Sequence, residues 1–147
     1  AANFSLGVAM LLRAVKRIGS ALPDWDCEIV DMHHARKQDA PSGTALALGQ
    51  AVAESRGSTL PERAVFARID KTGARKPGEI GFAVLRGGDV AGEHTVLFST
   101  EGERLEITHR AASRDIFARG ALAAALWIAH REPRLYSIDE VLAPGSV

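Results

Sequence analysis

The chain has 147 residues, of which 46% are hydrophobic and 24% charged, and its 18 basic side chains balance 18 acidic ones. This length suits one globular domain with a core of its own. The balanced charge argues against a nucleic-acid partner and against attraction to a membrane surface, because both favour a strong basic excess.

The sequence lacks the signals that direct a protein to a membrane or to an oxidising compartment. Cys27 is the single cysteine and has no partner for an internal disulfide, so we expect a buried core thiol. The opening residues AANFSLGVAM carry no basic region, and the longest uncharged apolar run, residues 120–129, is about half as long as a membrane crossing requires. We therefore expect a cytoplasmic protein. Because the chain begins without methionine and enters a helix almost at once, we also expect it to be an internal piece of a longer polypeptide.

Two helices with a strand between them are predicted in the first part of the chain. Ser5 is a suitable N-cap, and Gly19 is expected to end a helix whose apolar stripe is Val8, Leu11, Leu12, Val15 and Ile18. Residues 27–34 (CEIVDMHH) are typical of a short strand. A second helix is expected from Ser42 to Gly57, with the stripe Ala45, Leu48, Gly49 and Val52.

Beyond Gly57 the hydrophobic period changes to two, which predicts strands over residues 64–69, 79–85, 93–99 and 104–109. In the last of these, Leu105 and Ile107 are expected to face one way and the polar residues between them the other. The glycine-rich segment 87–92 lies between two predicted strands and opens no helix, so we expect a loop rather than a nucleotide-binding turn. This order of elements predicts an α+β fold, a mixed open β-sheet with flanking helices.

A final helix is predicted after Ser113, followed by a short turn to Val141. Its segment GALAAALWIA is apolar on every side, and such helices are normally covered by more than one neighbour. We expect the cover to be an oligomer interface or a domain that this chain does not contain.

The stretch HHARKQDAPSGTA, residues 33–45, carries the clearest chemical signal. His33 and His34 end a strand, where neighbouring side chains point to opposite faces, so only one is expected to face a given site unless the strand is already turning. Lys37 offers a positive charge in the following loop. The segment Ser42-Gly43-Thr44 begins a helix, whose free N–H groups and dipole suit a carboxylate or a phosphate.

Each of these residues also has a purely structural interpretation. Taken alone, the two histidines fit ordinary strand-end hydrogen bonding, Lys37 fits a solvated loop, and Ser42 fits a simple N-cap. A zinc site formed by the histidines and Cys27 is excluded on geometry, because adjacent strand histidines do not chelate one ion and no HxH or CxxC spacing is present. No metal is predicted.

Taken together, the stretch closely resembles the signature of the dihydrodipicolinate reductases, and its matching residues are His33, His34, Lys37, Asp39, Pro41, Ser42, Gly43 and Thr44. The opening AANFSLGV resembles the segment that joins the family's cofactor domain to its substrate domain. The segments GEHTVLF and ERLEITHRAASR resemble later strands of the family, so the resemblance covers nearly the whole chain.

The resemblance implies a role for each matching residue. His33 matches the family's proton donor and acceptor, and Lys37 matches a second proton donor that also partners the substrate's charge. His34, Gly43 and Thr44 match substrate-binding positions, with Ser42 beside them. The positions beside the nicotinamide of NADPH or NADH are matched by Ala1, Ala2, Asn3 and Phe4, and less directly by Arg114.

The resemblance also implies an organisation and a reaction. Residues 1–114 are expected to form the substrate-binding, catalytic and oligomerisation domain, and residues 115–147 to pack on a Rossmann domain that is absent from this chain. The family reduces a small cyclic dicarboxylate imine with a nicotinamide cofactor and assembles as homotetramers. Two alternatives stay open at this point: a related amino-acid-pathway dehydrogenase, and a catalytically silent oligomerisation module.

Overall fold

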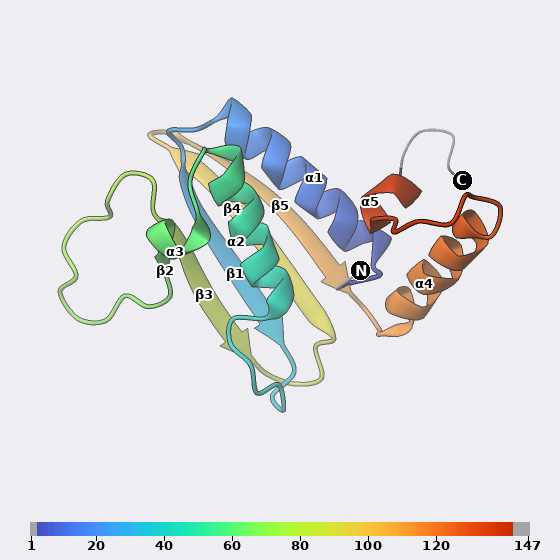
Figure 1. Ribbon diagram of the computed structural model, residues 1–147. Coiled ribbons are helices and arrows are strands. Elements are labelled where there is room, and N and C mark those ends of the chain that lie inside the picture. Colours follow the sequence, from blue (N-terminus) through green and yellow to red (C-terminus); the bar gives the residue numbers. More distant parts are fainter. Residues whose placement is uncertain (1–2, 143–147) are drawn as a thin grey trace.

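The structure is a computed structural model that describes residues 3–142 (Figure 1). Its elements in chain order are α1 (Leu6–Ala21), β1 (Asp26–His33), α2 (Gly43–Ser55), α3 (Leu60–Arg63), β2 (Ala64–Val65), β3 (Ile80–Arg86), β4 (Gly92–Thr100), β5 (Glu103–Ala111), α4 (Asp115–Ile128) and α5 (Ile138–Val141).

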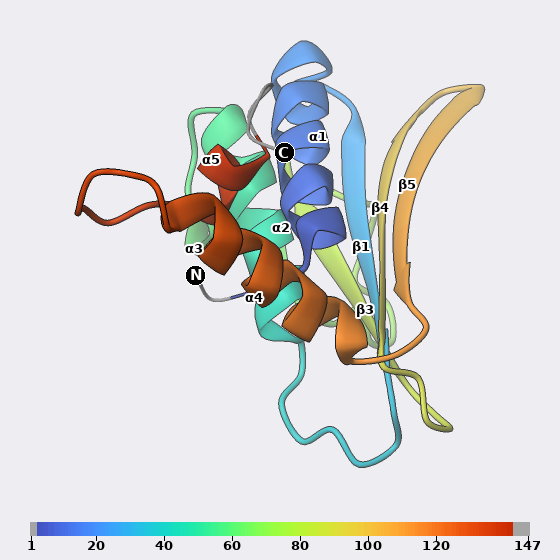
Figure 2. The ribbon, with the colours of Figure 1, turned by 90° about the vertical axis from the view of Figure 1, so that its right-hand side faces the viewer.

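The strands form one five-stranded sheet in the order β2-β3-β1-β4-β5. β1 pairs in parallel with β3, as does β2 with β3, whereas β4 is antiparallel to both β1 and β5. The predicted α+β class with a mixed open sheet is therefore confirmed. Figure 2 shows α1 and α2 together on one face of the sheet, and within residues 3–142 no helix lies over the opposite face.

Helix α1 begins as its sequence predicts but runs further. The Ser5 hydroxyl accepts the Val8 N–H at 3.2 Å and caps the helix. Gly19 does not end the helix, which continues to Ala21. A Cβ at Gly19 would lie 2.3 Å from the Ser55 hydroxyl, so this glycine allows α1 and α2 to approach closely rather than stopping the helix.

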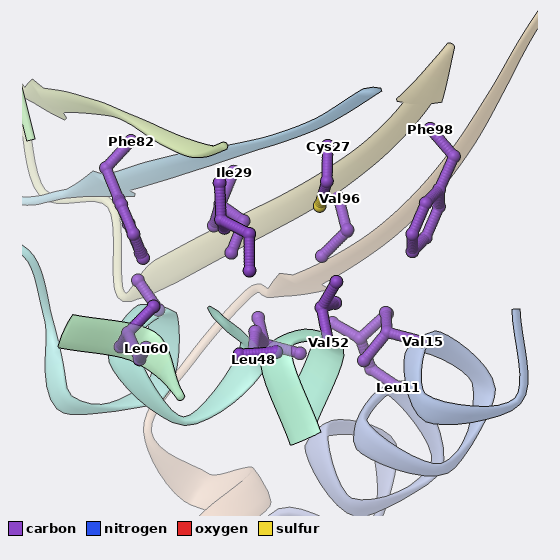
Figure 3. Packing of buried hydrophobic residues seen from close by; sticks show 13 residues of the cluster. Leu11, Val15, Cys27, Ile29, Leu48, Val52, Leu60, Phe82, Val96 and Phe98 are labelled. Atoms are coloured by element: carbon purple, nitrogen blue, oxygen red, sulfur yellow. The ribbon is translucent and has the colours of Figure 1, made fainter. Parts of the chain in front are cut away.

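Helix α2 is capped by Ser42, whose hydroxyl accepts the Ala45 N–H, and it ends at Ser55, two residues before the expected Gly57. The two helices and the sheet enclose the core shown in Figure 3, where Val15, Leu48 and Val52 face Ile29 and Phe98. Such burial is the main stabilising contribution in a domain of this size.

Cys27 lies in the core shown in Figure 3, fully buried and free of any disulfide. Burial raises the pKa of its thiol to about 12, which outweighs the lowering effect of Arg56 and Arg75. A thiol with such a pKa stays protonated at neutral pH and is a poor nucleophile. The predicted core thiol is confirmed.

Four of the five predicted strands are present within two residues of the expected bounds, whereas one prediction is largely wrong. The strand predicted over residues 64–69 pairs only at Ala64–Val65, and the chain then leaves the sheet with Ile69 72% exposed. Asp70 takes a positive φ of 57° directly afterwards, which extended pairing does not allow. Arg68 and Arg75 of this loop instead bind the Glu28 carboxylate on the sheet face that no helix covers.

The C-terminal helices lie beside the N-terminal end of α1 (Figures 1 and 2). Helix α5 is tied to α1 by Arg13, which binds the Asp139 carboxylate and donates to the Leu142 carbonyl. Helix α4 exposes Leu122 and Leu126, at 62% and 67%. The described residues therefore leave much of its apolar surface uncovered. No helix in residues 3–142 is both long enough and apolar enough to span a membrane.

Candidate active site

A cavity of about 550 Å³ opens where the end of β1, the start of α2 and the first turn of α1 meet the beginnings of α4 and α5. The predicted site residues that line it are Asn3, His33, His34, Lys37, Ser42, Gly43, Thr44 and Arg114. Phe4 lies instead in a neighbouring hollow between α4 and α5. Ala1 and Ala2 lie outside the described residues.

The two histidines reach the same cavity because the strand turns between them. β1 ends at His33, and the backbone then pairs with the glycine-rich loop that joins β3 and β4. His34 N–H donates to the Val90 carbonyl at 2.8 Å, and Gly87 N–H donates to the His33 carbonyl at 3.0 Å. The loop predicted at residues 87–92 is thus confirmed over residues 87–91, with Gly92 already in β4, and it holds the end of β1.

His33 is buried on one side and faces the cavity on the other, with 9% of its surface exposed. Its Nδ1 lies 2.9 Å from Oδ1 of Asp31. Burial is the main cause that lowers the pKa of His33 below its ordinary value, and His94, Lys37 and Arg86 lower it further. The Asp31 carboxylate acts in the opposite direction, because a negative neighbour favours the charged imidazolium.

Lys37 lines the cavity through its side chain, but its ammonium group is held at the rim. Its Nζ donates to Oδ1 of Asp39 at 2.8 Å, and this hydrogen bond lowers the pKa of that exposed carboxyl. The structure therefore places Lys37 beside the site, paired with an acidic residue two positions further along the chain.

The start of α2 presents an open binding surface. A Cβ at Gly43 would meet nothing within 4 Å, so a ligand can approach the backbone closely. The hydroxyl of Thr44 accepts a hydrogen bond from Asn3 Nδ2 at 3.1 Å, which leaves its own proton free to donate. Together with the first N–H groups of the helix, these donors favour an anionic group such as a carboxylate.

Three polar residues beside the site were not predicted: Asp31, Arg86 and His94. Asp31 is fully buried in β1, on the same face as Ile29 and His33. Because residues i and i+2 of a strand share a face, the sequence already places the charged Asp31 on the face of Ile29 and His33. That placement could have marked it as a site residue. His94 could not be found in this way, since its position follows from the pairing of β4 with β1.

These residues also bear on metal binding. Asp31, His33 and His94 each offer one ligand atom, and the three atoms lie within 4.8 Å of one another. This set of residues differs from the zinc site excluded on sequence grounds, which combined the two histidines with Cys27. Cys27 lies at the opposite end of β1, in the core. Arg86 Nη2 lies 3.4 Å from Oδ2 of Asp31, and its positive charge opposes a divalent cation at this place.

Comparison with known proteins gives a consistent result. The family described as "Dihydrodipicolinate reductase, C-terminus" matches residues 7–142. The 4-hydroxy-tetrahydrodipicolinate reductase of Zymomonas mobilis subsp. mobilis is 57% identical over 97% of this chain and 56% of its own length. That of Afipia carboxidovorans is 55% identical over 98% of this chain and 53% of its own length.

A solved structure shares the fold. The dipicolinate-bound dihydrodipicolinate reductase from Paenisporosarcina sp. TG-14 is similar with a TM-score of 0.75 and 26% identity, covering 95% of this chain and 52% of that one. The chain thus spans about half the length of the relatives it matches. It belongs to the family of dihydrodipicolinate reductase C-terminal domains.

Proposed function

We propose that this chain is the substrate-binding and catalytic half of an NAD(P)H-dependent reductase of the diaminopimelate and lysine pathway. Its substrate would be a cyclic dicarboxylate imine, dihydrodipicolinate or its 4-hydroxy precursor, and its product tetrahydrodipicolinate. The observation that carries the proposal is that one cavity collects a histidine, a lysine and an open helix start. The names of the relatives support the same reaction.

The start of α2 is suited to one carboxylate of this substrate. Thr44 has a free hydroxyl proton, Gly43 leaves space, and the helix dipole favours negative charge. Lys37 at the rim adds a positive charge for the second carboxylate or for charge that develops during the reaction.

His33 would deliver the proton. Reduction of a conjugated imine adds a hydride at one carbon and a proton at its neighbour, so the site needs an acid that can give up a proton near neutral pH. An imidazole suits this task. Because His33 is mostly buried yet lines the cavity, its proton is shielded from bulk water on one side and accessible to the substrate on the other.

The nicotinamide cofactor, NADPH or NADH, supplies the hydride when it is bound. The residues of this chain that would border it are Asn3, Phe4 and Arg114, of which Asn3 and Arg114 line the cavity. The exposed guanidinium of Arg114 suits an anionic neighbour. Residues 3–142 contain no strand, glycine-rich turn and helix in the arrangement that binds a pyrophosphate, so the main cofactor contacts would come from another domain.

Two proposals concern the rest of the molecule. The uncovered apolar surface of α4 would pack on the cofactor domain, in line with a division into residues 1–114 and 115–147. The sheet face without described helices would join subunits into a homotetramer, which is supported by exposed Leu85, whose position in β3 is of opposite parity to the core residues Ile80 and Phe82.

Calorimetry with dipicolinate tests the carboxylate site. We expect Thr44→Val to weaken dipicolinate binding by about 1.5–3 kcal/mol, the usual loss for a hydrogen bond to a charged group. Thermal stability should hardly change, because the cap of α2 is formed by Ser42 and not by Thr44. Thr100→Val, at the exposed far end of β4, is the matched control and should bind normally. Equal affinity in both variants would leave residues 42–44 as a helix cap only.

A further inference from the structure

Asp31 has no role in the reaction as described so far, yet its position is unusual. It is 0% exposed and lies on the helix-facing side of β1 between Ile29 and His33. A buried carboxylate is costly unless it is well compensated, and an apolar residue would fit this face better. A charge kept in such a place calls for an explanation.

The carboxylate contacts four different elements. Its Oδ2 accepts the Ser42 N–H at 2.8 Å and lies 3.4 Å from Arg86 Nη2. Its Oδ1 lies 2.9 Å from His33 Nδ1 and 3.4 Å from His94 Nε2. Asp31 therefore joins the end of β1, the cap of α2, β3 and β4 at one buried point.

The two carboxylate oxygens of Asp31 have different neighbours. Oδ2 serves the helix cap and Arg86, whereas Oδ1 makes no hydrogen bond with a described residue and is left to the histidines. Nδ1 of His33 is likewise buried with no described hydrogen-bond partner, and the atom beside it, at 2.9 Å, is Oδ1 of Asp31. Because the two imidazole nitrogens lie on opposite edges of the ring, Nδ1 beside Asp31 leaves Nε2 on the other side, next to Gly92. Ala91, the residue before Gly92, lines the cavity, as His33 does.

We infer that Asp31 is a positioning residue for the proposed reaction: it holds the His33 imidazole with a protonated Nδ1 toward the interior, so that Nε2 is the atom that carries protons to and from the substrate. The role in the reaction rests on the proposed function, whereas the state of the ring is a property of this chain alone. A carboxylate behind a histidine fixes its tautomer and stabilises the imidazolium in the same way in hydrolases.

The charges around the site agree with this role. Burial alone would raise the pKa of Asp31, but its polar contacts with His94 and Ser42 and the charge of His33 hold it well below its usual range. Asp31 is thus a permanent anion at neutral pH. The Asp31 carboxylate also opposes the burial and the cations that lower the pKa of His33. His33 can therefore still take up a proton.

Asp31→Asn is the informative variant, because the side chain keeps its size and loses one acceptor. One amide oxygen cannot serve both Ser42 N–H and His33 Nδ1–H. The helix cap and Arg86 retain the oxygen at the Oδ2 position, which turns the NH₂ group toward His33. A donor at that place forces the proton of neutral His33 from Nδ1 to Nε2.

Imidazole nitrogen shifts measured by NMR, on the natural polypeptide that contains this chain, report the tautomer directly. At a pH above the pKa of His33 we expect an Nδ1–H tautomer in the wild type and an Nε2–H tautomer in Asp31→Asn. The turnover number should fall roughly 10²–10⁴-fold, with a much smaller change in KM. Cys27→Ala, buried on the same face of the same strand, is the matched control. It should lose stability and change neither tautomer nor turnover number.

Three results would overturn the inference. A wild-type His33 with its proton on Nε2 would do so even if Asp31→Asn failed to fold. So would an Asp31→Asn protein with a normal turnover number, which would leave Asp31 as a helix cap. Activity lost in EDTA and restored by Zn²⁺ would assign the Asp31, His33 and His94 cluster to a metal instead. If the wild-type protein reduced no dicarboxylate imine, the proposed function would be wrong. The NMR shifts would still show whether Asp31 sets the tautomer of His33.

Discussion

His33 lies between groups that change its pKa in opposite directions. Burial lowers this pKa most, and His94 on β4, Lys37 in the loop and Arg86 on β3 add to the lowering, whereas Asp31 on β1 raises it. The net pKa lies below the ordinary value of 6.5. A residue that donates a proton must be protonated, so the proposed activity would be present below this pKa and lost as the pH rises through it.

We therefore expect kcat/KM to fall with rising pH along a limb whose midpoint lies below 6.5, measured by steady-state kinetics across the acid range. His130→Gln, which removes an exposed histidine beyond the end of α4, should leave the limb where it is. A limb above 6.5 would show that burial does not control the proton donor, and a flat profile would remove His33 from that role.

The residues of the site differ in how far the sequence could predict them. His33, Lys37 and residues 42–44 lie in one continuous stretch, so their motif could be read without knowing the fold. Asp31 and His94 become neighbours only because β1 pairs antiparallel with β4 and places their Cα atoms opposite each other. A pairing register is set by the whole sheet, and no local pattern reports it.

At the scale of elements, helices were predicted well where one apolar stripe is buried, as in α1 and α2. The bounds failed at Gly19, where a close helix contact outweighs the usual helix-breaking tendency of glycine. The strand predicted over residues 64–69 failed for a different reason. Its apolar residues Phe66 and Ile69 are exposed, because only Ala64–Val65 finds a pairing partner in β3.

In helix α4, packing and helix propensity predict opposite effects of one substitution on stability. Gly120 lies against the N-terminal segment, and a Cβ there would be 1.7 Å from the Phe4 carbonyl oxygen. Propensity alone predicts that Gly120→Ala stabilises α4 by about 1 kcal/mol and that Ala118→Gly, on its exposed side, destabilises it by as much. We expect the contact to dominate, so that Gly120→Ala displaces α4.

Hydrogen exchange at the Phe4 and Ser5 amides distinguishes the two effects. Faster exchange in Gly120→Ala than in the Ala118→Gly control is the expected result, because the clash acts on this segment directly. If Gly120→Ala slowed exchange and raised the melting temperature, the contact between α4 and residues 3–5 would not contribute to stability. The position of α4 would then be set by other neighbours.

At the scale of the whole molecule, the chain would provide one side of the proposed reaction site. The cavity has an open helix start that suits an anion, the buried His33 that we propose as the proton donor, and Lys37, while Asn3 and Arg114 border it where a cofactor would approach. The fold class, the mixed sheet and the polar residues of the cavity that lie in the 33–45 stretch could be predicted from sequence. The uncovered surface of α4 matches the expectation raised by its apolar sequence, and its proposed cover belongs to the half of the relatives that this chain does not span.

The most direct test of the central claim is the turnover number of His33→Gln for NAD(P)H-dependent reduction of the dicarboxylate imine, measured on the natural polypeptide that contains this chain. The account predicts a fall of roughly 10²–10⁴-fold, the usual contribution of a general acid, with a smaller change in KM. Dipicolinate affinity close to that of the wild type would show that the site is still folded. A turnover number near that of the wild type would contradict the account.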